Sequence, residues 1–253
     1  MFFCRNSEYI IIKPFGEYEM SINFFKKIVS NVCIVLVIAL VSIAAFAAPA
    51  VSVVTGVAPI YKAPGGNKVC LMVNVYWGEK YLDEMLDVFD RNGVKTTFFV
   101  GGCWVAKNEH KLKEIYDKGH EIANHGYFHK DHKKLGAEKN AQEISACHNL
   151  VKSILGVEMK LFSPPSASFS SVTLETAQKM GYTTVMYSRD TIDWRDKDVN
   201  LIKKRATKNI TGGELVLMHP TAATAEALED IITTIKSKGL ILTTVSDVLE
   251  IAD

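Results

Sequence analysis

The sequence predicts an α/β fold, namely a distorted (β/α) barrel of about seven strands preceded by an N-terminal apolar targeting helix. Three observations predict this class. After Lys68, short apolar runs alternate about seven times with segments of helical period, which indicates a parallel sheet with helical crossovers. The length of this part favours a closed or nearly closed barrel over an open sheet. The pattern GxGxxG of dinucleotide-binding sheets does not follow the first strand.

The targeting helix is predicted from a basic flank and a long apolar run. Lys26 and Lys27 precede an apolar stretch over residues 28–48, whose core 32–41 contains no polar residue and whose exit 45–47 is Ala-Phe-Ala. This order of flank, core and small-residue exit is typical of an export signal. At about 1.5 Å per residue the stretch is also long enough to span a bilayer, so signal peptide and membrane anchor both remain open.

We therefore divide the chain into four parts. Residues 1–27 are predicted to be a cytoplasmic leader, and a start at Met20 is an alternative because it gives the compact basic leader MSINFFKK. Residues 28–48 are the signal peptide or anchor, 49–67 a linker or an edge strand, and 68–253 the globular domain. This division predicts an extracytoplasmic domain, anchored in the membrane through its N-terminal segment or secreted into the cell envelope.

The first half of the domain predicts three strands and two helices between them. Residues 69–75 are a continuous apolar run of strand length, and 81–92 place four apolar side chains on one helical face. Residues 96–100 are a second strand, followed by a helix that ends at Gly119. Residues 121–124 form a short third strand.

The second half continues the alternation. A long helix over 138–155 is stopped by a glycine, and a strand begins at 161–162. Residues 172–180 are helical and 183–187 are a strand, again with a glycine between them. The remaining elements are predicted to be a helix at 201–209, a strand at 214–218, a helix at 225–238, a strand at 240–243 and a helix at 245–251.

Polar and titratable residues recur at the carboxyl ends of these strands, where active sites of such barrels lie. They are Asn74, Tyr76 and Trp77 after the first strand, His125 and His129 after the third, Ser163 to Ser166 after the fourth, Asp190 to Trp194 after the fifth, and His219 after the sixth. The sequence therefore predicts one site at this end of the barrel.

Composition and cysteine usage exclude several classes. The formal net charge of +1 and the lack of a basic stripe argue against a nucleic-acid partner. Three of the five cysteines lie in the globular part, without C-x-x-C spacing, which argues against a disulfide framework or a cysteine zinc site. The sequence does not predict the oligomeric state.

Three histidines carry the candidate chemistry. His125 and His129 stand four residues apart, a spacing that lets two imidazoles bind one metal ion, although two solvent-facing loop histidines have the same spacing. His219 ends the run LVLMH and is either a core histidine or a proton donor and acceptor. Asp193 and Trp194 could orient that histidine and wall a sugar pocket, and Asp193 could equally be a turn or cap residue.

These residues resemble the motifs of the polysaccharide deacetylases (carbohydrate esterase family four). GHEIANHGYFH is similar to the family's histidine-bearing motif, LFSPPS to its arginine–proline motif, SRDTIDW to its aspartate–tryptophan motif and LVLMH to its leucine-x-histidine motif. With the first strand end VNVYWG, five partial matches occur in the family's order between about residues 68 and 251. The Trp77-Gly78 pair resembles a sporulation-associated branch.

The resemblance implies metal-dependent hydrolysis of N-acetyl groups on an amino-sugar polymer such as peptidoglycan or a chitin-like glycan. It implies that His125 and His129, with one aspartate, hold a divalent ion, usually zinc, which activates water. His219 would protonate the leaving amine, with Asp193 as its orienting partner.

The same resemblance implies the substrate contacts. Leu217 and Trp194 would border the acetyl-methyl pocket, and a backbone N–H near Ser166 would help to hold the oxyanion. Trp77 and Tyr187 would add aromatic contacts to the sugar, since aromatic faces suit pyranose rings, although each of them alone could be an ordinary core residue.

The sequence departs from the family at three positions. Asn74 stands in the place of the base aspartate, Tyr76 in that of the ligand aspartate, and Ser163 in that of the arginine. An amide has no useful basicity, and loss of a general base typically costs about 10²–10⁴ in rate. Loss of a carboxylate ligand leaves two neutral imidazoles, a weaker metal site.

Three hypotheses follow. The first is a deacetylase with an impaired site that uses a metal hydroxide directly or a substitute such as Asp131 or His132. The second is an inactive glycan-binding or scaffold pseudoenzyme of the cell envelope. The third is a membrane-anchored interaction module without a sugar site. The predicted partner in the first two is an N-acetylated glycan.

Overall fold

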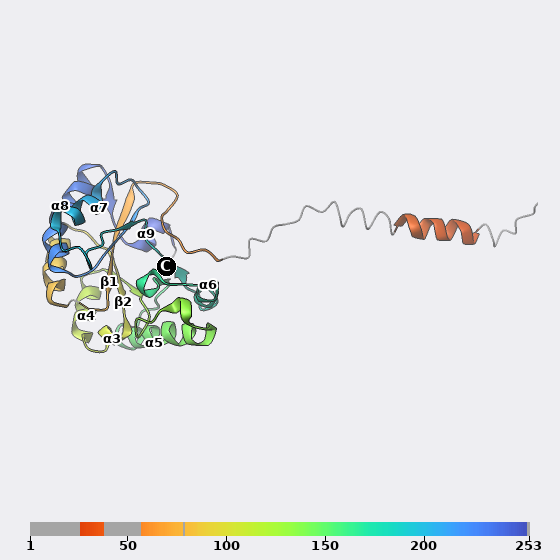
Figure 1. Cartoon of the computed structure of the whole chain (residues 1–253), viewed down its shortest axis with the longest axis horizontal. Helices are drawn as coiled ribbons and strands as arrows, with labels where there is room; N and C mark the ends of the chain where they lie inside the picture. Colours follow the sequence, from red (N-terminus) through yellow and green to blue (C-terminus); the bar gives the residue numbers. More distant parts are fainter. Residues whose placement is uncertain (1–25, 38–56, 78, 252–253) are drawn as a thin grey trace, which may run out of the picture. The chain divides into compact units, whose positions relative to one another are not determined.

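The computed structural model of the chain describes residues 26–37, 57–77 and 79–251 (Figure 1). Residues 26–37 form a helix with exposed side chains. Among these described ranges, none of the helices has both the length and the apolar character that a membrane crossing requires. The Met20 alternative, most of the predicted leader and the second half of the predicted targeting stretch lie outside the described residues.

The strands of the globular unit form one parallel sheet. They are β1 (Lys68–Val75), β2 (Thr97–Val100), β3 (Glu121–Asn124), β4 (Leu161–Phe162), β5 (Thr183–Thr184), β6 (Arg189–Asp190), β7 (Leu215–Met218) and β8 (Ile241–Leu242). The hydrogen-bonded order is β5-β4-β3-β2-β1-β7-β6, and β8 pairs with β1. All of these pairs are parallel, as the strand–helix alternation predicts.

The two ends of this row belong to one stretch of chain, which curls the sheet into a distorted barrel. β5 pairs with β4 and, a few residues later, β6 pairs with β7. Between them, Val185 N–H donates to the Phe162 carbonyl and Ser188 N–H to the Leu215 carbonyl. The predicted barrel of about seven strands is confirmed, and the single strand predicted at 183–187 is two short strands because the chain changes partner there.

Helices surround the sheet in the folded unit (Figure 1). They are α2 (Leu82–Arg91), α3 (Gly102–Val105), α4 (Glu109–Asp117), α5 (Ala137–Leu155), α6 (Ser171–Lys179), α7 (Val199–Thr207), α8 (Ala222–Ser237) and α9 (Val245–Leu249). α8 packs on α7 and α2, and α5 packs on α6 and α3. The sequence did not predict α3, because four residues show no periodicity. α5 ends at Gly156, whose φ of 74° is the left-handed conformation that glycine adopts without strain.

Two clusters of buried apolar side chains form the core. Along β1, Val69, Leu71 and Val73 contribute to the larger cluster with the helices, whereas Cys70 and Met72 contribute to the smaller one with Phe99 and other strand residues. This division follows from the strand period of two residues, which sends successive side chains to opposite faces. The smaller cluster therefore fills the inside of the curled sheet.

Part of the stretch predicted as linker or edge strand lies against this sheet. Ile60 forms a parallel bridge with Val185, and Lys62 an antiparallel bridge with Glu214. Ala63 is buried, and its N–H donates to the Gly213 carbonyl. An added Cβ at Gly212 would clash with the backbone of Gly66, just before β1, so glycine permits this close approach. Residues 60 and 62 thus form isolated bridges to the sheet and not a continuous edge strand.

Candidate functional site

The candidate site is formed by residues that follow the inward-facing side chains of the strands, two positions further along each strand. On β1, Cys70 and Met72 face the interior, so two residues further Asn74 points toward the mouth of the barrel. On β7, Leu215 faces the interior, and Leu217 follows it in the same way. His125 stands two residues after the inward-facing Ala123 of β3. Sheet register thus brings residues from distant parts of the chain to one cavity.

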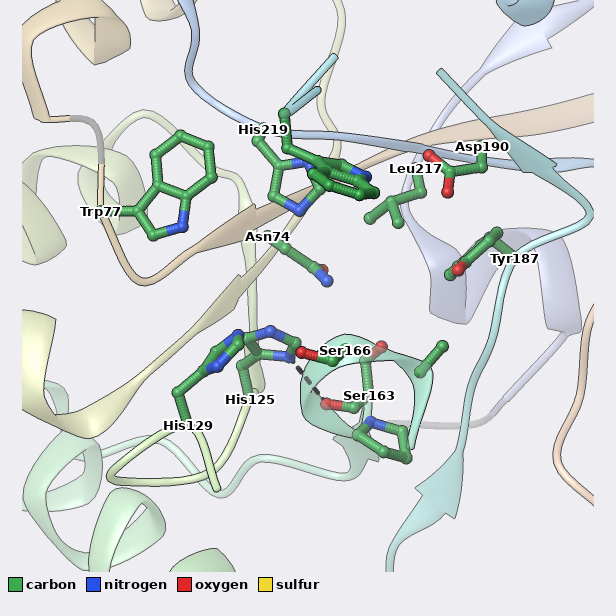
Figure 2. A pocket seen from close by; sticks show the side chains of 13 residues that line it. Asn74, Trp77, His125, His129, Ser163, Ser166, Tyr187, Asp190, Leu217 and His219 are labelled. Atoms are coloured by element: carbon green, nitrogen blue, oxygen red, sulfur yellow. Dashed lines mark hydrogen bonds between the residues drawn. The ribbon is translucent and has the colours of Figure 1, made fainter. Parts of the chain in front are cut away.

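This cavity has a volume of about 410 Å³ and opens at the carboxyl ends of the strands (Figure 2). Its lining consists of Asn74, Trp77, His125, His129, Ser163, Pro164, Ser166, Ala167, Tyr187, Asp190, Trp194, Leu217 and His219. The residues predicted to act as ligands, acid or substrate contacts are in this set except Asp193, which lies behind His219, and Tyr76, which packs against His129 outside the lining. The structure therefore brings the predicted site residues together at one place.

His219 is held by the buried carboxylate of Asp193. The His219 Nδ1–H donates to Asp193 Oδ1 at 2.8 Å, and the His219 backbone N–H donates to Oδ2 at 2.6 Å. The Thr224 hydroxyl donates to the same Oδ2 at 2.5 Å. Three donors thus satisfy an aspartate with no exposed surface, and the second ring nitrogen of His219 keeps its lone pair for the cavity.

His125 and His129 lie on the opposite side of the cavity from His219 (Figure 2). His125 is buried and donates from Nδ1 to the Ser163 carbonyl at 2.7 Å, while the His129 ring lies edge-on with its centroid 5.2 Å away. Burial, followed by the neighbouring His129, lowers the pKa of His125 to about 3. Burial also lowers the pKa of His129, so both imidazoles are neutral at pH 7.

Glu143 of α5 supports the loop that carries these two histidines, and sequence reasoning missed it. Its Oε2 accepts the backbone N–H groups of Tyr127 at 3.2 Å and Phe128 at 2.7 Å, and its Oε1 lies 3.2 Å from Lys130 Nζ. The signal in the sequence is weak, because a buried glutamate on a long helix looks like any polar helix residue. The histidine loop is therefore anchored to α5 by a nearly buried carboxylate.

Backbone conformation at the rim of the site is unusual. The non-glycine residues His129, Ser166, Ala167 and Ile192 all have φ between 53° and 56°, which is the left-handed region. Such conformations are uncommon for these residue types and cluster at binding and catalytic sites. His129, Ser166 and Ala167 line the cavity. Ile192 does not line it but directly precedes Asp193, which holds His219.

Tyr76 packs against the ring of His129. Its ring centroid lies 4.7 Å from that of His129, and its hydroxyl donates to the Phe128 carbonyl at 3.2 Å. An added Cβ at Gly101 would lie 2.4 Å from the ring, so the ring requires glycine there. Burial, followed by Cys103, raises the pKa of Tyr76, so this phenol is protonated at neutral pH.

The donor set does not fit a zinc ion held by two histidines and a carboxylate. In the described ranges, no three His, Cys, Asp or Glu side chains are placed to hold one metal ion. Asp190 is the carboxylate in the cavity lining, and it lies across the cavity from the histidine pair (Figure 2). Two neutral imidazoles and a phenol leave the charge of a divalent ion uncompensated.

The substitutes named from the sequence are engaged elsewhere. Asp131 accepts from the Ser168 hydroxyl and pairs with Lys134 at 3.0 Å, and it does not line the cavity. His132 is fully buried with Nδ1 2.7 Å from Asn140 Oδ1. The sequence placed Pro164 and Asp190 among the residues after strand ends without giving them a role, and it did not predict Ala167 at the site.

Comparison with known proteins identifies the family of this chain. The family model described as polysaccharide deacetylase matches residues 61–185. The chain is 39% identical over 193 residues to the uncharacterized protein YlxY of Bacillus subtilis, and this match covers 76% of the chain and 60% of YlxY. It is 30% identical to a peptidoglycan-N-acetylglucosamine deacetylase of Bacillus cereus, over 67% of the chain and 82% of that protein.

A solved structure with a similar fold is BA3943 of Bacillus anthracis, described as a CE4 family pseudoenzyme. The identity is 34%, the TM-score is 0.74, and the match covers 76% of this chain and 69% of the other. A mutant of BA3943 is described as having restored enzymatic activity. The fold, the ordered motifs and the relatives together show that this chain belongs to the polysaccharide deacetylase family.

Proposed function

We propose that this chain binds N-acetylated amino-sugar polymers of the cell wall at the His219 cavity and has lost the metal-dependent hydrolysis of its family. One observation supports the proposal: the cavity is lined by His125, His129, His219 and aromatic side chains, with Asn74 and Ser163 beside them and Tyr76 against His129. By the motif resemblance, Asn74, Tyr76 and Ser163 stand where the family's reaction needs two carboxylates and an arginine. The site thus retains the groups for binding and lacks the groups for activating water.

The missing base is the first argument. Asn74 is the side chain that enters the cavity from β1, and a carboxamide cannot accept the proton that an attacking water releases. Asp190, the carboxylate of the lining, already accepts the Ile192 N–H at 2.8 Å on the far side from the histidine pair. Loss of a general base lowers the rate by about 10²–10⁴.

The missing ligand is the second argument. His125, His129 and Tyr76 supply neutral donors at neutral pH, because burial lowers the pKa of both histidines and raises that of the tyrosine. A divalent ion would meet no negative charge among these three groups. Zinc binding at this site is therefore expected to be weak.

Aromatic side chains support glycan binding. Trp77 and Trp194 are 45% and 53% exposed and border the cavity, and Tyr187 lies on its other side. Exposed tryptophans are uncommon on a protein surface, and their apolar faces suit the C–H faces of pyranose rings. Similarity to a CE4 pseudoenzyme agrees with a protein that has kept the fold and lost the reaction.

A second candidate function is slow deacetylation. The intact contact between Asp193 and His219, with Nδ1–O distance 2.8 Å, favours it, because this pair could still protonate a leaving amine. Acid catalysis without an activated nucleophile gives a much lower rate than the complete site. Measured acetate release therefore separates the two candidates.

The proposal is tested with the full-length protein in two assays. Titration calorimetry with the tetramer of N-acetylglucosamine is expected to show binding, and Trp194→Ala is expected to weaken it about fivefold. Tyr116→Ala is the matched control, since Tyr116 is 40% exposed on α4, away from this cavity, and is expected to change nothing. Acetate release from the same tetramer is expected to stay at background, with and without added zinc.

Each result has a defined meaning. Absence of binding by the wild-type protein would overturn the glycan-binding proposal, and equal weakening by Trp194→Ala and Tyr116→Ala would remove the cavity from it. Acetate release that depends on His219 would select the second candidate.

We further propose that the domain is extracytoplasmic and that residues 28–48 direct it there as a signal peptide or a membrane anchor. The support is the basic flank, the apolar core and the small-residue exit of this stretch. A fusion to a reporter that is active only after export is expected to be active, and replacement of Val35 and Val37 by aspartate is expected to abolish that activity. A role in sporulation is a proposal from the Trp77-Gly78 resemblance, to be tested by the timing of expression.

A further inference from the structure

Asn74 is a buried amide without a hydrogen-bond partner among the described residues. It is 6% exposed, and its Oδ1 is shielded from solvent and makes no hydrogen bond to a described residue. Its Nδ2 likewise bonds to no described residue, and it is the amide atom that faces the cavity (Figure 2). Most buried polar groups in folded proteins are hydrogen-bonded, so an amide that bonds to no described residue is uncommon. Because Oδ1 is shielded, Nδ2 is the group of this amide that a ligand in the cavity can reach.

Two other buried asparagines of this chain show the contrast. Asn124 donates to the Ile144 carbonyl at 2.9 Å and accepts the Gly126 N–H at 2.8 Å. Asn140 donates to the Leu135 carbonyl at 2.9 Å and pairs with His132. These amides join elements of the fold, whereas the amide of Asn74 bonds to nothing in the part of the chain that the structure describes, so a structural role does not account for it.

The position of Asn74 aims its amide at the cavity. It continues the inward row of β1 after Cys70 and Met72, and it lines the cavity between its two histidine-bearing sides. Figure 2 shows the side-chain tip, with Nδ2 foremost, in the space between His219 and Ser166. A ligand group that enters this space meets an N–H donor that has no other acceptor.

We propose that Asn74 makes the cavity select N-acetylated over deacetylated amino sugars, by donating an Nδ2–H hydrogen bond to the acetamido carbonyl oxygen. This inference rests on the proposed glycan binding and specifies what the site recognises. The acetamido group has an acceptor oxygen, whereas the ammonium group of a deacetylated sugar is a donor only and cannot satisfy Nδ2. An aspartate at the same position would prefer the ammonium group, because a carboxylate is an acceptor only. Asn74, in the place of the base aspartate, instead supplies a donor that can bind the acetyl oxygen.

The test compares two tetramers by titration calorimetry on the full-length protein: the tetramer of N-acetylglucosamine and its fully deacetylated form. The wild-type protein is expected to bind the acetylated tetramer about tenfold more tightly, the factor that one net hydrogen bond confers. Asn74→Leu, which removes the donor, is expected to abolish most of this preference. Asn74→Asp is expected to reverse it in favour of the deacetylated tetramer.

Asn200→Asp is the matched control, because it makes the same charge change at an exposed position on α7. It is expected to keep the wild-type preference. Circular dichroism establishes that the variants fold. An N-thioacetyl tetramer extends the test to the wild-type protein, since its sulfur is a larger atom and a weaker hydrogen-bond acceptor than oxygen, and it is expected to bind several-fold more weakly than the acetylated tetramer.

The outcomes separate the two proposals. Equal binding of acetylated and deacetylated tetramers by the wild-type protein would overturn the role of Asn74 and leave glycan binding standing. A preference that survives in Asn74→Leu and Asn74→Asp, or equal binding of the thioacetyl tetramer, would do the same. Binding of neither tetramer by the wild-type protein would overturn glycan binding itself.

Discussion

The indole ring of Trp77 lies parallel to the imidazole ring of His219, with centroids 5.5 Å apart and an angle of 8° between the planes. The two residues follow β1 and β7, which pair directly through Met72 and Leu217, so the register of the sheet produces this contact. Asp193 holds His219 through Nδ1 while Trp77 stacks on the ring face. The imidazole is thereby held in one orientation toward the cavity.

The replaced motif positions predict a gain of function. Asn74→Asp, Tyr76→Asp and Ser163→Arg together are expected to create a zinc site with His125 and His129 and to raise acetate release by about 10²–10⁴-fold. Bound zinc is measured by mass spectrometry, and acetate by an enzyme-coupled assay.

The matched control for this triple variant adds His219→Ala and is expected to bind zinc without the gain in rate. A folded triple variant that takes up no additional zinc would show that the first motif is aligned wrongly.

We expect truncation of Asp193 to lower the stability of the folded protein strongly. Asp193→Ala leaves the His219 N–H, the His219 Nδ1–H and the Thr224 hydroxyl without their acceptor in a buried place. The free energy of unfolding, measured by urea denaturation, is expected to fall by about 2–3 kcal/mol. Asp117→Ala, at an exposed position, is the control and is expected to stay within about 0.5 kcal/mol of wild type. Equal effects of both changes would contradict a supporting role of Asp193.

Glu143 predicts a local effect on the histidine loop. Glu143→Ala removes the acceptor of the Tyr127 and Phe128 amides, so hydrogen exchange of residues 126–130 is expected to accelerate, and unfolding free energy to fall by about 1.5–3 kcal/mol. Glu138→Ala on the same helix is the control, because Glu138 is exposed and bonds only to Gln142 among described residues. Unchanged exchange in the loop of Glu143→Ala would disprove this support.

We expect protonation of His120 to lower the stability of the protein in acid. It is buried and its Nδ1 accepts the Thr96 N–H, and burial, followed by the charge of Lys95, lowers its pKa to about 4 from an ordinary value of 6.5. Between pH 4 and pH 6.5 the unfolded chain therefore binds more protons at this residue than the folded protein does. The stabilising contribution of neutral His120 is complete above pH 6.5 and is lost as the pH falls toward 4.

Thermal melting across this range tests the prediction. His120→Asn keeps an acceptor for Thr96 and removes the titration, so the melting temperature is expected to depend less steeply on pH. His110→Asn is the control, since His110 is exposed and is expected to leave the slope unchanged. A wild-type slope in His120→Asn would show that His120 does not titrate as proposed.

Much of the fold could be predicted because its signal is local. The apolar run of β1, the apolar face of α2 and the glycine after α5 are read from neighbouring residues, and their alternation indicates the parallel sheet. The misses are of two kinds. α3 is too short to show a period, and the 183–190 stretch divides into β5 and β6 because it changes partner strand, which no local pattern reveals.

The sequence by itself determined the order of strands and helices, the family motifs and the positions after strand ends where His125, His129 and His219 stand. Only the tertiary structure decided that these histidines share one cavity, that Glu143 anchors their loop and that the amide of Asn74 has no partner in residues 57–77 and 79–251. The physical reason is that each of these contacts joins residues far apart in the chain. Such contacts depend on the register and curl of the whole sheet, which local periodicity does not encode.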